Sequence, residues 1–188
     1  MKRAQYRNPT GTALLLIDVI NDLDFPQADE LLQSALPMAK KIQQLKTSAQ
    51  QAGAPVIYVN DNFGRWQSDW KSQVAHCERP ESNGREIVQL LRPDSDDFFV
   101  LKPKHSGFYS TTLDVLLQHL SCRSVILTGI ATNICVLFTA NDAYMRDYRV
   151  RVPRDCSAAN RQTDHDDAIR QMEWVLKAET CPGEEIQW

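Results

Sequence analysis

Three residues that could do chemistry stand at or near the ends of short apolar runs. Asp18 follows LLLI, Lys102 ends FFVLK, and Cys135 begins a helical pattern shortly after SVILTG. A carboxylate after such a run is costly to desolvate unless it is paired, and perturbed ionisable groups gather at functional sites. A cysteine in the first turn of a helix lies where backbone N–H groups and the helix dipole favour a nucleophilic thiolate. Each residue also has an ordinary interpretation. Cys135 could fill a small core site, Asp18 could be a turn or cap residue, and Lys102 could be an edge residue whose ammonium reaches solvent.

Together these residues would supply a nucleophile, a base and a cation. A thiol has an ordinary pKa of about 8.5, so at neutral pH it needs a base or a cationic neighbour to attack a carbonyl carbon well. Asp18 would accept the thiol proton, and Lys102 would stabilise both anions. The N–H groups of the turn before Cys135 would stabilise an oxyanion. No G-x-S-x-G, Walker A or G-x-G-x-x-G motif offers a competing system.

The elements that must position these residues alternate along the chain between strand and helix. Mostly continuous apolar runs predict strands at Ala13–Val19, Pro55–Asp61, Phe98–Lys102, Ser124–Gly129 and Arg149–Val152. Helical patterns predict helices at about Asp29–Gln51, Gly84–Leu91, Thr112–Leu120, Asn133–Arg146 and Thr163–Ala178. Gly53 is placed to end the first helix.

This alternation predicts the fold class. We expect a three-layer α/β/α fold, with a Rossmann-like parallel sheet of five to six strands and helices on both faces. The charged residues of the fifth strand place it near an edge of the sheet. No repeat or linker divides the chain, so residues 1–188 are expected to form a single domain.

Candidate substrate contacts follow the second predicted strand, at the edge where open α/β sheets bind ligands. The irregular segment 62–83 is long, and such a loop is more often functional than idle. Asp61 and Asn62 could orient a polar substrate or act as turn and cap residues. Arg65 could bind a carboxylate or remain a solvated surface residue. Trp66 could line a pocket, or pack on one face of a short helix or in an oligomer contact.

Composition and charge narrow the class of protein. The 188 residues are 43% hydrophobic and 24% charged with a net charge of -3, which gives no basic footprint for nucleic acid. The apolar run Ala13–Ile17 is too short for a signal peptide or a membrane span. Five cysteines without a C-x-x-C pair predict no disulfide framework and favour a reducing, cytoplasmic setting. The four histidines have no metal-ligand spacing, so neither a zinc site nor a cofactor is expected.

Four blocks in order carry a specific resemblance to a known family. They read ALLLIDVINDLDFP, PVIYVNDNFGRW, FFVLKPKHSGFYSTTLDVLL and VILTGIATNICVLFTANDAYMRDYRVRVPRDCSAA. With these blocks the chain resembles the isochorismatase-like cysteine hydrolase superfamily over nearly its full length. The resemblance implies an Asp-Lys-Cys triad at Asp18, Lys102 and Cys135. It also implies an oxyanion hole from the N–H groups of Ala131 and Cys135, and a cis peptide bond between Ile130 and Ala131.

Lys104 is a rival to Lys102, because residues two apart lie on the same side of an extended strand. The intervening Pro103, together with the family's spacing to Ser106, favours Lys102. The same stretch, SGFYST, is expected to place Phe108 near the site.

The chain also departs from parts of the family. The nicotinamidases carry a metal-binding Asp-x-His pattern after the second strand, whereas this chain reads Asp61-Asn62-Phe63, so neither a bound metal nor nicotinamidase activity is expected. The isochorismatases that cleave a vinyl ether typically lack the cysteine, so Cys135 favours hydrolysis of an amide, carbamoyl or ureido C–N bond of a small molecule through a thioester. Vinyl ether hydrolysis with Asp18 as acid, and a non-catalytic small-molecule binder, remain alternatives. The resemblance further suggests a homo-oligomer, either a dimer or a tetramer.

Overall fold

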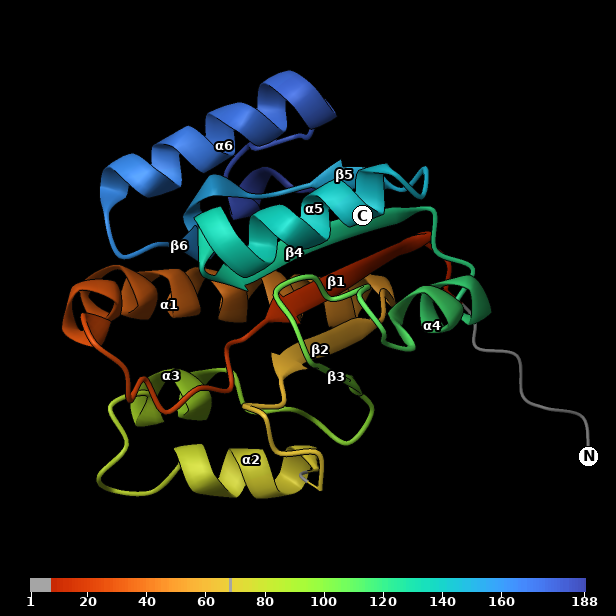
Figure 1. Cartoon of the computed structure of the whole chain (residues 1–188). Helices are drawn as coiled ribbons and strands as arrows, with labels where there is room; N and C mark the ends of the chain where they lie inside the picture. Colours follow the sequence, from red (N-terminus) through yellow and green to blue (C-terminus); the bar gives the residue numbers. More distant parts are fainter. Residues whose placement is uncertain (1–7, 68) are drawn as a thin grey trace, which may run out of the picture.

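The computed structural model describes residues 8–67 and 69–188, and its centre is one parallel sheet (Figure 1). The strand order is β3-β2-β1-β4-β5, and a short sixth strand pairs with the end of β4. The strands are β1 (Thr12–Ile17), β2 (Val56–Asp61), β3 (Phe98–Lys102), β4 (Ser124–Ile130), β5 (Arg149–Arg151) and β6 (Ser157–Ala158). The predicted fold class is confirmed, and the fifth strand lies at an edge of the sheet as expected.

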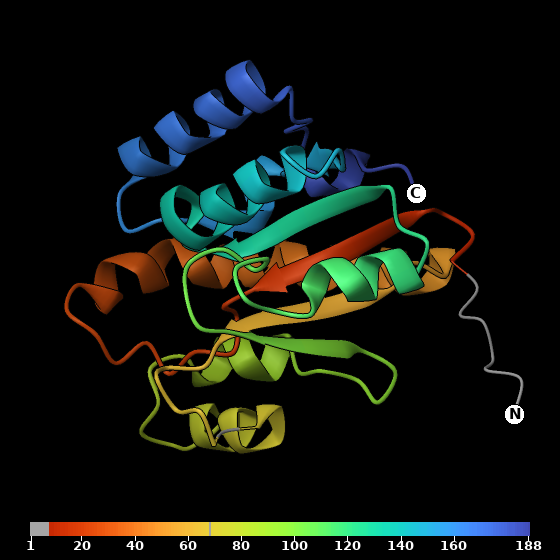
Figure 2. The ribbon, with the colours of Figure 1, turned by 45° about the vertical axis from the view of Figure 1, so that its right-hand side comes forward.

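Helices cover both faces of this sheet, as Figures 1 and 2 show. One face carries α1 (Ala28–Ala52), α2 (Trp70–Cys77) and α3 (Arg85–Leu90). The other face carries α4 (Leu113–His119), α5 (Leu137–Tyr144) and α6 (Gln162–Leu176). Among the described residues, no helix is both long enough and apolar enough to cross a membrane.

The alternation of side chains along β1 creates two cores. Leu14 and Leu16 point to the core beneath α1, whereas Ala13, Leu15 and Ile17 point to the core beneath α4 and α5. All five side chains are fully buried, which explains why the strand reads as a continuous apolar run. A strand buried on both faces holds the residue that follows it in a fixed position.

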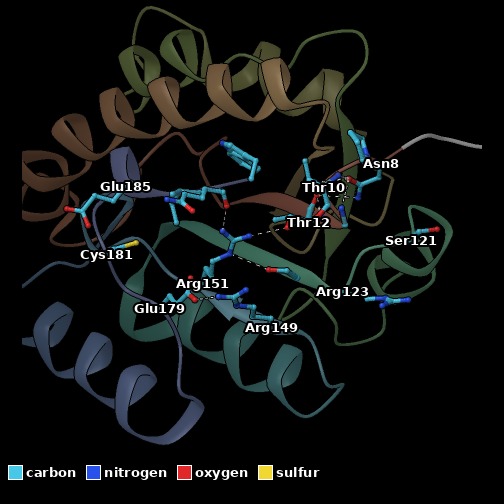
Figure 3. A pocket seen from close by; sticks show the side chains of 16 residues that line it. Asn8, Thr10, Thr12, Ser121, Arg123, Arg149, Arg151, Glu179, Cys181 and Glu185 are labelled. Carbon is cyan, nitrogen blue, oxygen red and sulfur yellow. Dashed lines mark hydrogen bonds and ion pairs between the residues drawn. The ribbon is translucent and has the colours of Figure 1, made fainter.

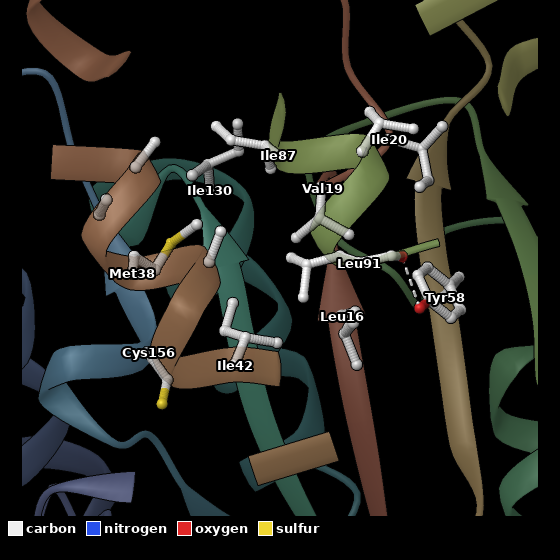
Figure 4. Packing of buried hydrophobic residues seen from close by; sticks show 14 of the residues in the cluster. Leu16, Val19, Ile20, Met38, Ile42, Tyr58, Ile87, Leu91, Ile130 and Cys156 are labelled. Carbon is white, nitrogen blue, oxygen red and sulfur yellow. Dashed lines mark hydrogen bonds between the residues drawn. The ribbon is translucent and has the colours of Figure 1, made fainter. Parts of the chain in front are cut away.

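Figure 4 shows the core under α1. Met38 and Ile42 of α1 belong to it together with Leu16 of β1 and Tyr58 of β2. The hydroxyl of Tyr58 donates to the carbonyl oxygen of Leu91 at 2.7 Å. This bond satisfies a buried polar group and ties β2 to the end of α3.

Two elements differ from the sequence expectation. The segment 62–83, expected to be irregular, contains α2, which begins where the Asp69 carboxylate accepts a hydrogen bond from the Ser72 N–H at 3.0 Å. Val74 and Cys77 bury one side of this short helix, and two apolar residues leave too little periodicity to predict it. The strand β6 has only two residues, which is too short for any alternating pattern.

A surface pocket of about 820 Å³ lies at the amino-terminal edge of the sheet (Figure 3). Arg151 lines it and is only 6% exposed. Its guanidinium donates to the Thr12 hydroxyl at 3.1 Å, to the Ser124 hydroxyl at 3.4 Å and to the Gln187 carbonyl oxygen at 2.6 Å. These bonds join β1, β4 and the C-terminal segment at the edge opposite to the expected reactive residues.

Candidate active site

The carboxyl-terminal ends of four neighbouring strands bring the expected reactive residues together. Lys102 is the last residue of β3 and is paired in register with Asp61, the last residue of β2. Asp18 directly follows β1, and Cys135 lies in a π-helical turn, η1 (Thr132–Val136), after β4. Because these strands are parallel, their ends share one edge of the sheet.

The carboxylate of Asp18 is held by its neighbours in a buried position. Its backbone is left-handed, with φ of 52°, a conformation that aspartate adopts more readily than most residues. One oxygen accepts a hydrogen bond from the Asp61 N–H at 2.7 Å, and the other lies 2.8 Å from the Lys102 ammonium. Burial raises the pKa of Asp18, and the Lys102 charge and the Cys135 thiol oppose this effect without cancelling it. A carboxylate with a raised pKa is a better proton acceptor for a thiol.

Asn60, which sequence reasoning missed, fixes the chain just beyond Asp18. Its fully buried amide accepts a hydrogen bond from the Ile20 N–H at 3.1 Å and donates to the Ile20 carbonyl oxygen at 2.8 Å. The signal that could have revealed it was a polar amide within the apolar run PVIYVN, because a buried amide must find partners.

The ammonium group of Lys102 is the centre of the cluster. Its side chain is fully buried, and Nζ lies 2.8 Å from Asp18, 3.5 Å from the Asp61 carboxylate and 3.5 Å from the Cys135 sulfur. Burial alone would lower the pKa of Lys102, but the charges of Asp18 and then of Cys135 raise it above the ordinary value. The rival Lys104 is exposed, and only its carbonyl oxygen reaches the site, where it accepts from Lys102 at 3.2 Å.

The sulfur of Cys135 completes the cluster, 3.5 Å from the Lys102 ammonium. The pKa of Cys135 is raised to about 12, mainly because the sulfur is desolvated and then because of the Asp18 charge, while Lys102 acts in the opposite direction. Burial and the Asp18 charge thus oppose the thiolate that the start of a helix favours. A base is needed to take the thiol proton, and the Asp18 carboxylate, which contacts the same Lys102 ammonium, is the candidate.

The turn that precedes Cys135 has the backbone conformation that the resemblance implies. The peptide bond between Ile130 and Ala131 is cis. The Ala131 carbonyl oxygen accepts from the N–H groups of Ile134 at 3.0 Å and Val136 at 3.2 Å, which closes the wide turn of η1. Within the described part of the chain, the N–H of Ala131 donates no hydrogen bond, so it is available to an oxyanion.

His105 lies beside the sulfur, a position that no pattern in the sequence predicts. Its Nδ1 is 3.9 Å from the Sγ of Cys135. The imidazole is exposed and meets the ring of Phe138 edge to face, with centroids 5.4 Å apart. No spacing links residues 105 and 135, because the contact depends on how the loop after β3 packs on α5.

Two of the expected substrate contacts, Asp61 and Asn62, hold the turn after β2. Asp61 accepts a hydrogen bond from the Phe63 N–H at 2.7 Å with one oxygen, and its other oxygen faces Lys102. The buried Asn62 accepts from the Gly64 N–H at 2.9 Å. Asp61 therefore borders the reactive cluster, whereas Asn62 serves the turn.

The two others on this loop, Arg65 and Trp66, are open to solvent. Arg65 lines a small pocket of about 210 Å³ together with Gln73 and His76. Gln73 donates to the Asp61 carbonyl oxygen at 2.8 Å, which connects this pocket to the cluster. Trp66 is 80% exposed.

Phe108 lies in the core rather than at the reactive groups. Its side chain is 5% exposed, and its ring packs 4.9 Å from the Arg146 guanidinium and 6.0 Å from the Tyr148 ring. The structure therefore assigns it to packing beneath α5, because a buried ring has no surface to offer a substrate.

The residues at the end of β2 do not suit a metal ion. Phe63, two residues after Asp61, has no donor atom, and in residues 8–67 and 69–188 no three His, Cys, Asp or Glu side chains are arranged to hold a metal.

A parallel α/β sheet here carries a carboxylate, a lysine and a thiol at its carboxyl edge, and it is this site rather than the fold that bears on function. The chain belongs to the isochorismatase family of hydrolases, because the Isochorismatase domain profile matches residues 12–181. It is 44% identical over 174 residues to the uncharacterized isochorismatase family protein YaaI of Bacillus subtilis, an alignment that covers 93% of this chain and 95% of that protein.

Other relatives are named as amidohydrolases. The chain is 30% identical over 170 residues to the ureidoacrylate amidohydrolase RutB of Acinetobacter baylyi, covering 74% of this chain and 67% of that protein. Its structure is similar to N-carbamoylsarcosine amidase of Thermoplasma acidophilum, with a TM-score of 0.74 and 27% identity over 94% of this chain and 99% of that chain.

Proposed function

We propose that this protein is a cysteine amidohydrolase that cleaves a carbamoyl or ureido C–N bond of a small molecule through a thioester on Cys135. The observation that carries the proposal is a cluster centred on the buried Lys102 ammonium, which lies 2.8 Å from the Asp18 carboxylate and 3.5 Å from the Cys135 sulfur. The names of two relatives, a ureidoacrylate amidohydrolase and an N-carbamoylsarcosine amidase, support the substrate class.

The first half of the reaction forms the thioester. Asp18 takes the thiol proton while the sulfur attacks the carbonyl carbon, so the thiolate never has to exist free in a desolvated site. The N–H groups of Ala131 and Cys135 stabilise the oxyanion, and Lys102 stabilises the two anions beside it. Asp18 then gives its proton to the leaving nitrogen, and the C–N bond breaks.

The second half hydrolyses the thioester and restores the thiol. Water attacks the acyl carbon, the C–S bond breaks, and the acid product leaves. Asp61, which borders the cluster, and Arg65, on the loop that follows it, are proposed to orient the polar part of the substrate.

A substrate panel with matched variants tests the proposal. Ammonia release is measured with ureidoacrylate, N-carbamoyl amino acids, simple amides and nicotinamide, for the wild-type protein and for Cys135→Ala and Cys181→Ala. We expect the ureido and carbamoyl compounds to be hydrolysed, Cys135→Ala to lose about 10⁴-fold or more, and Cys181→Ala, at the opposite edge of the sheet, to keep wild-type activity.

Three outcomes would contradict the proposal. Activity that survives Cys135→Ala would point to vinyl ether chemistry with Asp18 as the acid, which isochorismate tests directly. Turnover of nicotinamide alone would exclude the substrate class. Binding of panel compounds without turnover, and without a mass adduct on Cys135, would indicate a non-catalytic binder.

A further inference from the structure

We propose that His105 is a second proton-transfer residue of this site and takes the proton from the water that hydrolyses the thioester. The inference rests on the proposed function, since it assigns a residue to the second half of that reaction. It starts from the 3.9 Å contact between the His105 Nδ1 and the Cys135 sulfur, the atom that carries the acyl group.

The loop after β3 holds His105 in this position from both sides. Before it, the Lys104 carbonyl oxygen accepts from the Lys102 ammonium at 3.2 Å. After it, the Ser106 hydroxyl donates to the carboxylate of Asp142 on α5, and the Gly107 N–H donates to the Thr139 hydroxyl on the same helix at 3.0 Å. Such anchoring is what a proton-transfer group needs, because catalysis depends on a fixed geometry.

The imidazole itself is also supported. The ring of Phe138 meets it edge to face, with centroids 5.4 Å apart. This contact restricts the orientation of the imidazole beside the sulfur.

Asp18 is poorly placed for the same task. Asp18 is only 5% exposed and lies on the buried side of the cluster, beside the Lys102 ammonium. His105 is exposed, so its imidazole can meet a water molecule that arrives from solvent. The two groups therefore divide the work: Asp18 acts on the buried side during acylation, and His105 acts on the open side during hydrolysis.

In the proposed step, His105 first accepts a proton from water and then returns it to the sulfur. The water oxygen bonds to the acyl carbon while one of its protons moves to Nδ1 of His105. The C–S bond then breaks, its electron pair goes to the sulfur, and the protonated imidazole returns the proton to Sγ across the observed contact. The products are the free thiol of Cys135 and a carboxylic acid, and water is the single co-reactant.

The test separates acylation from hydrolysis with p-nitrophenyl acetate as the acyl donor. Stopped-flow release of p-nitrophenolate is recorded for the wild type, for His105→Gln and for the matched control His119→Gln, which alters an exposed histidine of α4. Glutamine keeps a polar side chain of similar reach but cannot carry the proton. We expect the burst rate of His105→Gln to stay within about twofold of wild type and the steady-state rate to fall about 10²-fold.

Two further readouts exclude a merely structural effect. The acetyl group should accumulate on Cys135 of His105→Gln, detected as a mass adduct, and hydroxylamine, which needs no base to attack, should restore turnover. Equal losses in burst and steady-state rates, or an unchanged steady-state rate, would overturn the role of His105 and leave the thioester mechanism standing. A wild-type protein without a burst, or a burst that persists in Cys135→Ala, would overturn both.

Discussion

Asp18 and Lys102 act on the sulfur of Cys135 in opposite directions. The Asp18 charge raises the pKa of the thiol, and the Lys102 charge lowers it. The two charges therefore work against each other at the thiol. Asp18 is placed to accept the thiol proton, and the Lys102 charge opposes the rise that burial causes in the pKa of Asp18.

This opposition predicts that Asp18→Asn makes the thiol more reactive while it stops hydrolysis. Without the carboxylate charge, the pKa of Cys135 falls, so iodoacetamide should alkylate it about tenfold faster at pH 8. Hydrolysis of a ureido substrate should fall about 10³-fold, because the proton acceptor is gone. Mass spectrometry assigns the label to Cys135.

The matched control is Lys102→Met, which should slow alkylation because the cation that lowers the pKa is removed. If Asp18→Asn slowed alkylation as well, Asp18 would be activating the resting thiol, and the proton-acceptor role would have to be abandoned.

At this scale the sequence predicts the reactive residues better than their surroundings. Asp18 and Lys102 can be recognised in the sequence because a charged side chain next to a buried apolar run is costly to desolvate. This signal comes from neighbouring residues in the sequence and needs no knowledge of the fold. His105 and Asn60 are not recognisable in this way, because their roles come from contacts with Cys135 and Ile20 that only the folded loops create.

Among the elements, β4 and the turn after it place the nucleophile. Gly129 lies opposite Ile17 in the register of β1 and β4 and has φ of 107°, which side-chain-bearing residues rarely adopt. A Cβ atom there would lie 2.0 Å from the Ile17 carbonyl oxygen. The close approach of the two strands brings the cysteine turn next to Asp18.

We therefore expect Gly129→Ala to lower the free energy of unfolding by about 4 kcal/mol or more, since strain and a backbone clash add. Gly11→Ala provides the control, because Gly11 also has a positive φ of 63° but no atom near its Cβ position. That variant should lose only about 1–2 kcal/mol. Urea denaturation measures both values, and equal losses would show that the close approach to Ile17 is not the cause.

The turn is also supported from α6 through His165. Its Nδ1 lies 2.9 Å from the Thr132 hydroxyl, and burial lowers the pKa of His165. As the pH falls, the unfolded chain binds the proton first, at an ordinary pKa of about 6.5. The stabilisation is therefore complete above that pH and is lost as the pH falls toward the lower pKa of the folded state.

The free energy of unfolding should thus fall more between pH 8 and pH 5.5 for the wild type than for His165→Gln, whose amide can still bond Thr132. Parallel pH curves for the two proteins would refute this account. Carboxylates that titrate in the same range contribute equally to both proteins and cancel in the difference.

Element boundaries illustrate what sequence patterns can and cannot fix. The strands are within a few residues of their predicted positions, because burial on both faces demands continuous apolar runs. The predicted helix 133–146 is in fact η1 followed by α5, since a local widening of the helix leaves no trace in apolar spacing. Gly53, with φ of 72°, ends α1 as expected.

Across the whole molecule, the carboxyl-terminal and amino-terminal edges of the sheet carry different groups of residues. The carboxyl edge holds the reactive cluster, and the amino edge holds the buried Arg151, which binds β1, β4 and the C-terminal segment. The Val152 N–H donates to the Glu179 carbonyl oxygen at 2.7 Å, so this segment also covers the edge strand β5. The sequence does not predict that Arg151 joins these segments, because arginine is usually a surface residue.

We expect Arg151→Met to lower the free energy of unfolding by about 2–4 kcal/mol, because the Thr12 and Ser124 hydroxyls and the Gln187 carbonyl oxygen lose a charged donor. Hydrogen exchange should quicken in residues 179–187 before it quickens in β2 or β3. Arg123→Met is the control: Arg123 is an exposed residue lining the same pocket, and its loss should cost less than about 0.5 kcal/mol. The kcat of both variants should stay near wild type, since Arg151 and Arg123 lie at the edge of the sheet opposite to the reactive cluster. A large loss of kcat in Arg151→Met, at a temperature where it is fully folded, would show that the two edges are coupled and that the amino edge acts on the site.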